Sequence, residues 1–445
     1  MNLCGFPALP RTIHPRKRYV GMSVQRRRLV SVVAAALGSA LAATGLSACG
    51  ATPDKDVTLR MVAADYGDAK AHNSSTAYWD GVARSFEQRN PHIKVDVEVV
   101  DWDHVDDKVS DMVKAGHAPD VAQIGSYADY AADGLLYSAD DIFPISMQAD
   151  FIPSLVSAGS VHRVQYGIPW ASSSRLFFYN KGLFKDAGIK DAPRTWNDIA
   201  KDAARLKEHG VKVPYGLPLG TEEAQAESLM WMLGASGGYT DTVGGYTFDS
   251  LANVTAFSWL KDNLVAKGLT GPGDPAKTNR RTVFADFLAG EAGMINGHPT
   301  LLAQAKAAHI DVGVAALPGQ HGPSPDTLGV ADWMMAFKQK DDHLAADSAF
   351  LRYVYSPENS LRFLDQYGLL PVTTSASQAM ERNPRDADML QFLDRLPEAV
   401  FYPVGKTSWG PVSDQVKKTI GSAVDGDPKQ VLGTLQRFAA AQAGK

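Results

Sequence analysis

Apolar and polar residues alternate in two early segments of the chain, and a period of two predicts β-strands. The first alternation covers residues 57–61 and the second covers 93–99. Between them, Trp79, Ala83 and Phe86 recur at helical spacing, which predicts an amphipathic helix. The first part of the chain is therefore expected to run strand, helix, strand.

The same alternation of element types continues further along the chain. A third strand is predicted at 121–124, directly after Pro119 and Asp120. Thr195 is predicted to cap the start of a helix, because Asp198 stands at the third helical position and completes a capping box. Strands that alternate with helices form parallel βαβ units, so the chain is expected to have an α/β fold.

The N-terminal segment has the pattern of an export signal. Arg26–Arg28 are followed by fifteen uncharged residues, 29–43, and this run is shorter than the roughly 20 residues of a membrane span. The motif Leu46-Ser47-Ala48-Cys49 resembles the lipobox of bacterial lipoproteins. That resemblance implies cleavage of a signal peptide, residues 1–48, and attachment of lipid to Cys49. Residues 49–56 would then form a tether.

Two details of export stay open at the sequence level. Met22 would give a signal of ordinary length, so the start of translation is either Met1 or Met22. Arg26, Arg27 and Leu29 loosely resemble a twin-arginine signal, whereas a general secretory signal has the same basic character.

Composition narrows the class of protein. Removing the signal leaves about 400 residues, which suggests two domains. The net charge of -5 disfavours nucleic-acid binding, which needs a basic face. The two cysteines are Cys4 and Cys49, so the mature fold is expected to have no disulfide and no thiolate metal site. No cofactor and no metal are implied, and a monomer is expected.

Short motifs stand in order over most of the mature chain: Pro119-Asp120-Val121, Tyr166 to Pro169, Phe178 to Lys181, Phe184 with Ala187 to Ile189, Pro193 with Thr195, Trp196 and Asp198, and Phe287 with Gly290 to Ala292 and Met294. This ordered set resembles the extracellular solute-binding proteins of ABC importers, in the sugar-binding family typified by maltose-binding protein. Most of these residues belong to turns, caps and packing positions, so they indicate the fold more directly than the ligand.

The resemblance implies a two-lobed periplasmic-binding-protein-like fold with a three-segment hinge and a ligand cleft between the lobes. The N-terminal lobe would contain 57–171 plus 297–328, and the C-terminal lobe 172–296 plus 329–445. The hinge crossings would lie near Ala171–Arg175, Gly293–Asn296 and Leu328–Ala331. The closed form would deliver a carbohydrate to ABC permease subunits, with the protein anchored by lipid to the outer face of the cytoplasmic membrane.

Candidate ligand-binding residues follow the predicted strands, since ligands of open α/β sheets bind outside the strands' carboxyl ends. A sugar needs carboxylates or amides for its hydroxyl groups and flat aromatic rings for its faces. The residues of these types predicted to bind ligand are Asp65, Tyr66, Trp102, Ser126, Tyr127, Trp170, Ser173, Glu222, Asn296, Asp332 and Trp333. Structural roles are the alternatives, such as a cap for Asp65, a hinge wedge for Trp170 and a core position for Trp333.

These loops contain many carboxylates and few basic residues, which argues against a phosphorylated ligand. A neutral sugar fits this balance, and an amino sugar is compatible with it. Arg175 is the exception, unless it pairs with a carboxylate across the hinge.

Other readings are a glycerophosphodiester- or polyol-binding protein, a sensory lipoprotein without a transporter, a metal-binding lobe, and an exported glycoside hydrolase. A hydrolase would need two carboxylates that flank a glycosidic bond. The chain has no Gly-x-Ser-x-Gly elbow and no His-Glu-x-x-His helix, so a binding protein is preferred to an enzyme.

Overall fold

The structure is a computed structural model that describes residues 56–67 and 73–444. The predicted signal peptide, Cys49 and the tether as far as residue 55 lie outside the described residues. None of the described helices combines the length and apolar character needed to cross a bilayer.

The first of two main sheets has six strands in the order β12-β11-β3-β1-β2, with β6 paired to β11. β1 is parallel to β2 and β3, whereas β11 is antiparallel to β3 and β6. The predicted strands at 57–61, 93–99 and 121–124 are confirmed. The strands are β1 (Val57–Ala64), β2 (Ile93–Val100), β3 (Val121–Ile124), β6 (Ile168–Ser174), β11 (Thr327–Ala336) and β12 (Ala399–Val400).

Helices cover both faces of this sheet because both faces are apolar. Met61 packs into the core on one face and its neighbour Val62 into the core on the other, as the period of two requires. The first core is completed by α1 (Ser75–Arg89), α13 (Leu344–Val354) and α14 (Pro357–Tyr367), and the second by α2 (Val105–Lys114) and α3 (Ala128–Ala132). Smaller elements are α4 (Ala139–Ile142), α5 (Ile145–Gln148), α6 (Pro153–Ala158), β4 (Ser160–Val161) and β5 (Val164–Gln165).

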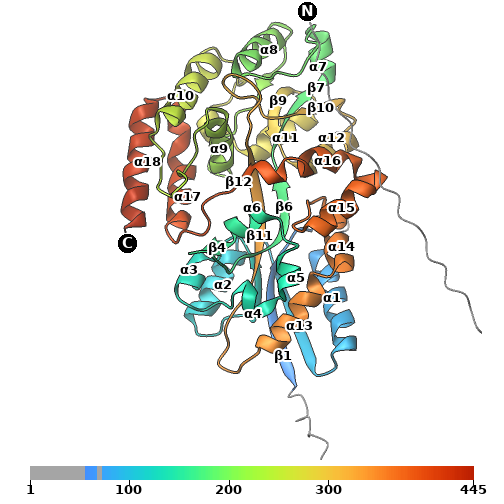
Figure 1. Ribbon diagram of the computed structural model, residues 1–445. Helices are drawn as coiled ribbons and strands as arrows, with labels where there is room; N and C mark the ends of the chain where they lie inside the picture. The colour runs from blue at the N-terminus through green and yellow to red at the C-terminus, as the bar shows by residue number, and fades with distance from the viewer. Residues whose placement is uncertain (1–55, 68–72, 445) are drawn as a thin grey trace, which may run out of the picture. The chain divides into compact units, whose positions relative to one another are not determined.

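The second sheet has four strands in the order β10-β7-β9-β8. Phe177 and Phe178 on β7 point to opposite faces and belong to separate cores. The strands are β7 (Leu176–Asn180), β8 (Val213–Tyr215), β9 (Ala292–Gly297) and β10 (Val312–Ala315). The surrounding helices are α7 (Lys181–Asp186), α8 (Trp196–Glu208), α9 (Ala224–Gly234), α10 (Leu251–Leu260), α11 (Arg280–Leu288), α12 (Pro299–Ala307), α15 (Thr374–Arg382), α16 (Ala387–Leu393), α17 (Trp409–Thr419) and α18 (Pro428–Ala443) (Figure 1).

The predicted capping box at the start of α8 is confirmed. The Thr195 side chain accepts a hydrogen bond from the backbone N–H of Asp198, and the Asp198 carboxylate accepts from the backbone N–H of Thr195. Two backbone donors of the helix start are satisfied in this way.

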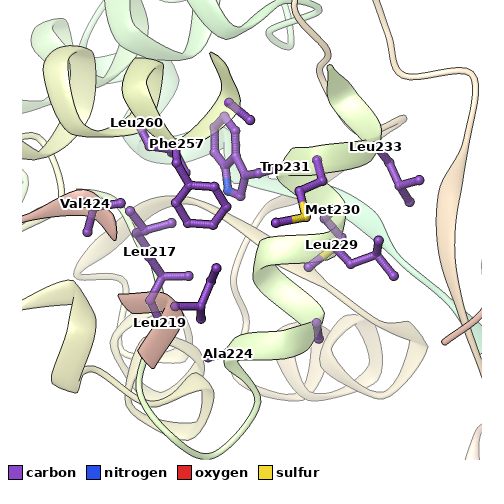
Figure 2. Close-up of a cluster of buried hydrophobic side chains, with 14 of the residues drawn as sticks. Leu217, Leu219, Ala224, Leu229, Met230, Trp231, Leu233, Phe257, Leu260 and Val424 are labelled. Atoms are coloured by element: carbon purple, nitrogen blue, oxygen red, sulfur yellow. The ribbon is translucent and has the colours of Figure 1, made fainter. Parts of the chain in front are cut away.

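Helix α9 lies within the core, and every residue from Ala224 to Leu233 is buried. Figure 2 shows Trp231 beside Phe257 of α10, with Leu217 and Leu219 below them. A helix that is apolar on all sides must be covered on all sides. Any charged residue on α9 is consequently taken out of water.

The chain passes between the sheets along an antiparallel ribbon formed by β6 and β11 (Figure 1). Arg175 joins β6 of the six-stranded sheet directly to β7 of the four-stranded sheet. Leu370 pairs with Ser172 beside this ribbon, so a third segment passes here. The predicted crossings Ala171–Arg175 and Leu328–Ala331 both fall in the ribbon.

The structure corrects the other predicted crossing and the lobe bounds. Gly293–Asn296 lies inside β9, which pairs with β7 and β8 within one sheet. The segment 297–328, predicted for the N-terminal lobe, contains α12 and β10, and β10 pairs with β7 of the four-stranded sheet. The chain after 329 first completes β11 and adds α13 and α14 to the first sheet. The N-terminal lobe is defined here by the six-stranded sheet and the C-terminal lobe by the four-stranded sheet.

A buried acid in the N-terminal lobe gives a pH-dependent stability. Asp347 on α13 is fully buried, and neither of its carboxyl oxygens has a hydrogen-bond partner. Burial, followed by the charges of Asp120 and Asp342, raises its pKa to about 8. An unfolded aspartate has a pKa near 3.9, so the unfolded chain releases this proton at lower pH than the folded protein does. The contribution of Asp347 to the free energy of unfolding therefore falls as pH rises between about 4 and 8.

We expect Asp347→Asn to raise the melting temperature relative to wild type, by an amount that grows from pH 4 to pH 8. Asparagine has the same shape and does not ionise, so it removes the energetic cost of keeping a buried acid protonated. Thermal unfolding of both proteins across this range measures the effect. A melting-temperature difference that is the same at pH 4 and pH 8 would contradict the assignment.

Candidate functional site

The carboxyl ends of β1, β2 and β3 bring together a group named here the aromatic–carboxylate cluster, consisting of Tyr66, Trp102, Gln123 and Asp332. The Tyr66 hydroxyl donates to Oδ2 of Asp332 at 2.5 Å and accepts from Nε2 of Gln123 at 2.9 Å. The Trp102 ring meets the Tyr66 ring edge to face, 5.3 Å between centroids, and 36% of Trp102 is exposed. The cluster thus offers a carboxylate beside an exposed aromatic surface.

The strand β11 has a register shift between Asp332 and Trp333. Such an irregularity re-aims a side chain in a strand. Burial raises the pKa of Asp332 to about 6, the Tyr66 hydrogen bond and the Arg175 charge lower it, and the Asp106 charge raises it. The pKa of Tyr66 is raised well above its ordinary value, first by burial and then by Asp332. At neutral pH Tyr66 is therefore a hydrogen-bond donor.

The matching end of the four-stranded sheet holds an ion-pair cluster, consisting of Arg175, Glu222, Glu223, Arg280 and Arg281. Nη2 of Arg175 lies 3.2 Å from Oε1 of Glu223, and both side chains are mostly buried. Arg280 contacts both glutamates: its Nη2 lies 3.0 Å from Oε1 of Glu222, and its Nε contacts Oε2 of Glu223. Nε of Arg281 lies 3.3 Å from Oε2 of Glu222. Each of the three guanidinium groups is thus paired with a glutamate.

Glu227 on α9 adds a buried carboxyl group beside this cluster. Its Oε1 accepts hydrogen bonds from the Tyr215 hydroxyl at 3.1 Å, Trp231 Nε1 at 2.8 Å and Asn296 Nδ2 at 3.0 Å. Burial raises its pKa to about 7, although the three hydrogen bonds oppose this shift; the charge of Glu223 raises it further. Burial therefore gives Glu227 a larger protonated fraction near neutral pH than an exposed glutamate has.

A small cavity of about 20 Å³ lies between these groups. His298 on its lining is held neutral, because burial lowers its pKa well below 6.5 and the Arg175 and Arg280 charges lower it further. The lining residues are Arg175, Pro218, Glu223, Ala226, Glu227, Met230, Arg280, Phe284, Asn296, Gly297 and His298.

A larger hollow of about 770 Å³ lies at the opposite end of the six-stranded sheet, beside Val57 and Ile93 at the starts of β1 and β2. Open α/β sheets bind ligands outside the carboxyl ends of their strands. We therefore place the candidate site at the two clusters and not in the larger hollow.

Five of the predicted site residues fall in the two clusters or on the cavity: Tyr66, Trp102, Glu222, Asn296 and Asp332. Ser173 lies beside the ion-pair cluster, where its hydroxyl accepts from Nη1 of Arg175 at 2.9 Å. Asp65 and Ser126 are exposed at strand ends, but Asp65 accepts from the backbone of Gly67, and Ser126 bonds to Asp106. These contacts give Asp65 and Ser126 local structural partners.

The prediction is corrected for three aromatic residues. Tyr127, Trp170 and Trp333 are 0%, 1% and 1% exposed, and they are parts of the hydrophobic cores of the N-terminal lobe. Tyr127 and Trp333 pack against each other with centroids 5.5 Å apart, and the Tyr127 hydroxyl donates to the carbonyl of Ala158. Side chains packed in this way stabilise the lobe and present no surface to a ligand.

Sequence reasoning missed Arg280 and Glu227. Glu227 stands alone as a charge within the apolar run of α9, and a lone charge in such a run is a usable signal for a buried functional acid. Arg280 follows a turn at the start of α11 and carries no comparable signal.

Comparison with known proteins agrees with the fold. The family model "Bacterial extracellular solute-binding protein" matches residues 70–360. A protein of Brucella abortus (strain 2308), named as a binding protein without a stated ligand, is 29% identical over 384 residues, which cover 84% of this chain and 90% of that protein.

Two solved structures are similar in fold. The GacH receptor of Streptomyces glaucescens, solved unliganded and with acarbose, has a TM-score of 0.72 at 20% identity over 88% of this chain and 99% of that one. UgpB of Mycobacterium tuberculosis in complex with glycerophosphocholine has a TM-score of 0.68 at 20% identity, covering 87% of this chain and 98% of that one.

Proposed function

The chain belongs to the bacterial extracellular solute-binding protein family, and from this premise we propose that it captures a carbohydrate and delivers it to the permease of an ABC importer. Members of this family are exported binding proteins that hand a small molecule to membrane subunits. Lipid attachment at Cys49 and a monomeric state are parts of the proposal, with the protein held at the outer face of the cytoplasmic membrane.

The observation that carries the carbohydrate assignment is the charge balance of the site. Arg175 and Arg280, the guanidinium groups that line the described cavity, are paired with glutamates, and the neutral His298 adds no charge. A phosphate group is usually held by arginine forks or lysines that are available to it. The described cavity lining contains no arginine or lysine that is without a glutamate partner, and this favours a neutral ligand over a phosphodiester. Asp332 and Asn296 suit sugar hydroxyl groups, and Trp102 suits a ring face.

The test is a thermal-shift screen of the purified protein with maltose, acarbose, a chitin oligosaccharide, glucosamine, glycerol and glycerophosphocholine. A ligand that binds the native state alone raises the melting temperature by mass action. A shift with a carbohydrate supports the proposal. A shift with glycerophosphocholine alone would contradict the charge argument while keeping the transport role, and no shift with any compound would favour the sensory alternative.

Trp102→Ala is expected to weaken binding of the selected carbohydrate at least tenfold, because exposed aromatic anchors contribute a large share of binding energy. Trp102→Phe keeps a ring face and should retain part of the affinity. Titration calorimetry measures both variants. The melting temperature without ligand should change little, since Trp102 is the partly exposed member of the cluster. Unchanged affinity in Trp102→Ala would remove Trp102 from the site.

A further inference from the structure

A segment of the C-terminal lobe reaches the N-terminal lobe outside the ribbon that joins the two sheets. Residues 401–408, named here the interlobe strap, connect β12 to α17 (Figure 1). Val404 of this strap packs against the core that contains α9 and α10, and also against the N-terminal core that contains Tyr127. The two lobes therefore meet at this strap as well as along the ribbon of β6 and β11.

Gly405 fits against the N-terminal lobe only because it has no side chain. A Cβ atom at this position would lie 2.5 Å from the carbonyl oxygen of Ser160 and 3.3 Å from the hydroxyl of Tyr127. Non-bonded carbon atoms are most stable about 3.5–4.0 Å apart, so the approach to Ser160 is too close for any side chain. The φ angle of Gly405 lies outside the left-handed region, so glycine is needed here for space and not for its backbone conformation.

The N-terminal side of this contact is held in place by hydrogen bonds. Ser160 begins β4, which pairs with β5, and its hydroxyl donates to the carbonyl of Val156 at 2.7 Å. The hairpin closes on Gly159, whose carbonyl accepts from the backbone N–H groups of Tyr166 and Gly167. Moving the Ser160 carbonyl away from the strap would strain these hydrogen bonds.

The strap is held equally well by the C-terminal lobe. The Tyr402 ring stacks on Trp409 with 5.5 Å between centroids, and Trp409 lies at the same distance from Tyr239. The Ser408 hydroxyl lies 3.0 Å from the hydroxyl of Tyr246, within hydrogen-bond distance. The strap is therefore expected to move together with the C-terminal lobe.

The contact lies on the side of the lobes where the candidate site is found. Tyr127 follows the carboxyl end of β3, one of the strand ends that carry the aromatic–carboxylate cluster. Tyr402 of the strap lies near the ion-pair cluster: burial raises its pKa well above the ordinary value, the Glu223 charge raises it further, and the Arg175 charge lowers it. The spacing between strap and hairpin therefore affects the lobes on the side where a ligand is expected.

We propose that the contact between the interlobe strap and the β4–β5 hairpin sets how closely the two lobes approach each other, with Gly405 as the residue that permits the close approach. This inference rests on the proposed function for its link to ligand binding, and it adds a control element outside the candidate ligand contacts. A side chain at position 405 must push strap and hairpin apart by about 1 Å, because both are fixed to their own lobes. A protein held further open would bind its ligand more weakly, since its binding-competent arrangement is less populated.

Small-angle X-ray scattering of the ligand-free protein tests the spacing of the lobes. Gly405→Leu should have a larger radius of gyration than wild type, and Gly405→Ala should have an intermediate value. Titration calorimetry with the carbohydrate selected from the screen above should show affinity at least threefold weaker in Gly405→Ala and weaker still in Gly405→Leu. A role confined to local packing would lower the melting temperature and leave the radius of gyration and the affinity unchanged, which would contradict the inference.

Gly410→Ala is the matched control. Gly410 lies in the first turn of α17, and a Cβ atom there would meet no atom within 4 Å. This variant should keep the wild-type radius of gyration and affinity. Wild-type values of both quantities in a folded Gly405→Leu protein would overturn the inference and leave the proposed function standing, and Gly405→Ala decides by the same criteria if the leucine variant fails to fold. A screen without any binder would contradict the proposed function, whereas the scattering comparison would still decide the inference about the strap.

Discussion

Trp170→Ala is expected to lower the free energy of unfolding by about 3–5 kcal/mol, the usual cost of deleting a large aromatic side chain from a core. Trp170 is 1% exposed and lies within 4.9 Å of Phe363, 5.4 Å of Tyr355 and 5.7 Å of Trp79, measured between ring centroids. Alanine would leave a cavity that these rings cannot fill without leaving their own packing positions. Chemical denaturation measured by far-UV circular dichroism gives the change.

Trp102→Ala provides the comparison, because the same residue type is replaced at a partly exposed position. It should cost less than about 1 kcal/mol of stability, as surface substitutions usually do. Comparison of the two variants therefore distinguishes the loss of core packing at Trp170 from the loss of ligand contact at Trp102. If Trp170→Ala kept wild-type stability and abolished ligand binding, the original expectation of a ligand-binding Trp170 would be restored.

Arg175→Met is expected to destabilise the protein by about 3 kcal/mol, near the lower end of the cost of breaking a buried ion pair. The Arg175 side chain is 7% exposed and that of Glu223 is 20% exposed. In the variant, Glu223 would lose this partner at a position where little water can replace it. Arg280 still contacts Glu223 and limits the loss. Denaturation midpoints of wild type and variant measure it.

The double variant Arg175→Met with Glu223→Gln should be less destabilised than the sum of the two single variants, because contacting partners are coupled. Arg281→Met is the exposed control. The Arg281 side chain is 73% exposed, and such a pair contributes about 0–1 kcal/mol. Additive effects of Arg175→Met and Glu223→Gln would show that the two side chains are not energetically coupled.

The local features of the fold could be predicted from the sequence because they depend on neighbouring residues. The strands at 57–61, 93–99 and 121–124 follow from alternation of side chains between two faces. The capping box of Thr195 and Asp198 follows from hydrogen bonds that span three residues. The fold class followed from the alternation of such elements, and the ordered motifs indicated the family.

The lobe bounds and the buried aromatics required the tertiary structure. The segment 297–328 returns to the four-stranded sheet because β10 pairs with β7, more than a hundred residues earlier in the chain. A local sequence pattern does not predict a pairing between strands so far apart in the chain. Trp170 and Trp333 occupy strand positions whose environment depends on helices from distant segments, so residue type alone did not separate core from site.

The sequence by itself determined the strands, the helix caps, the α/β class and the excess of carboxylates in the strand-end loops, since each depends on residue type and short spacing. Only the tertiary structure decided which charges meet. It paired Arg175 with Glu223, and it placed Glu227 on the lining of the small cavity beside them. The reason is physical: Coulomb energies and burial depend on distances through space, and the chain's fold alone sets those distances.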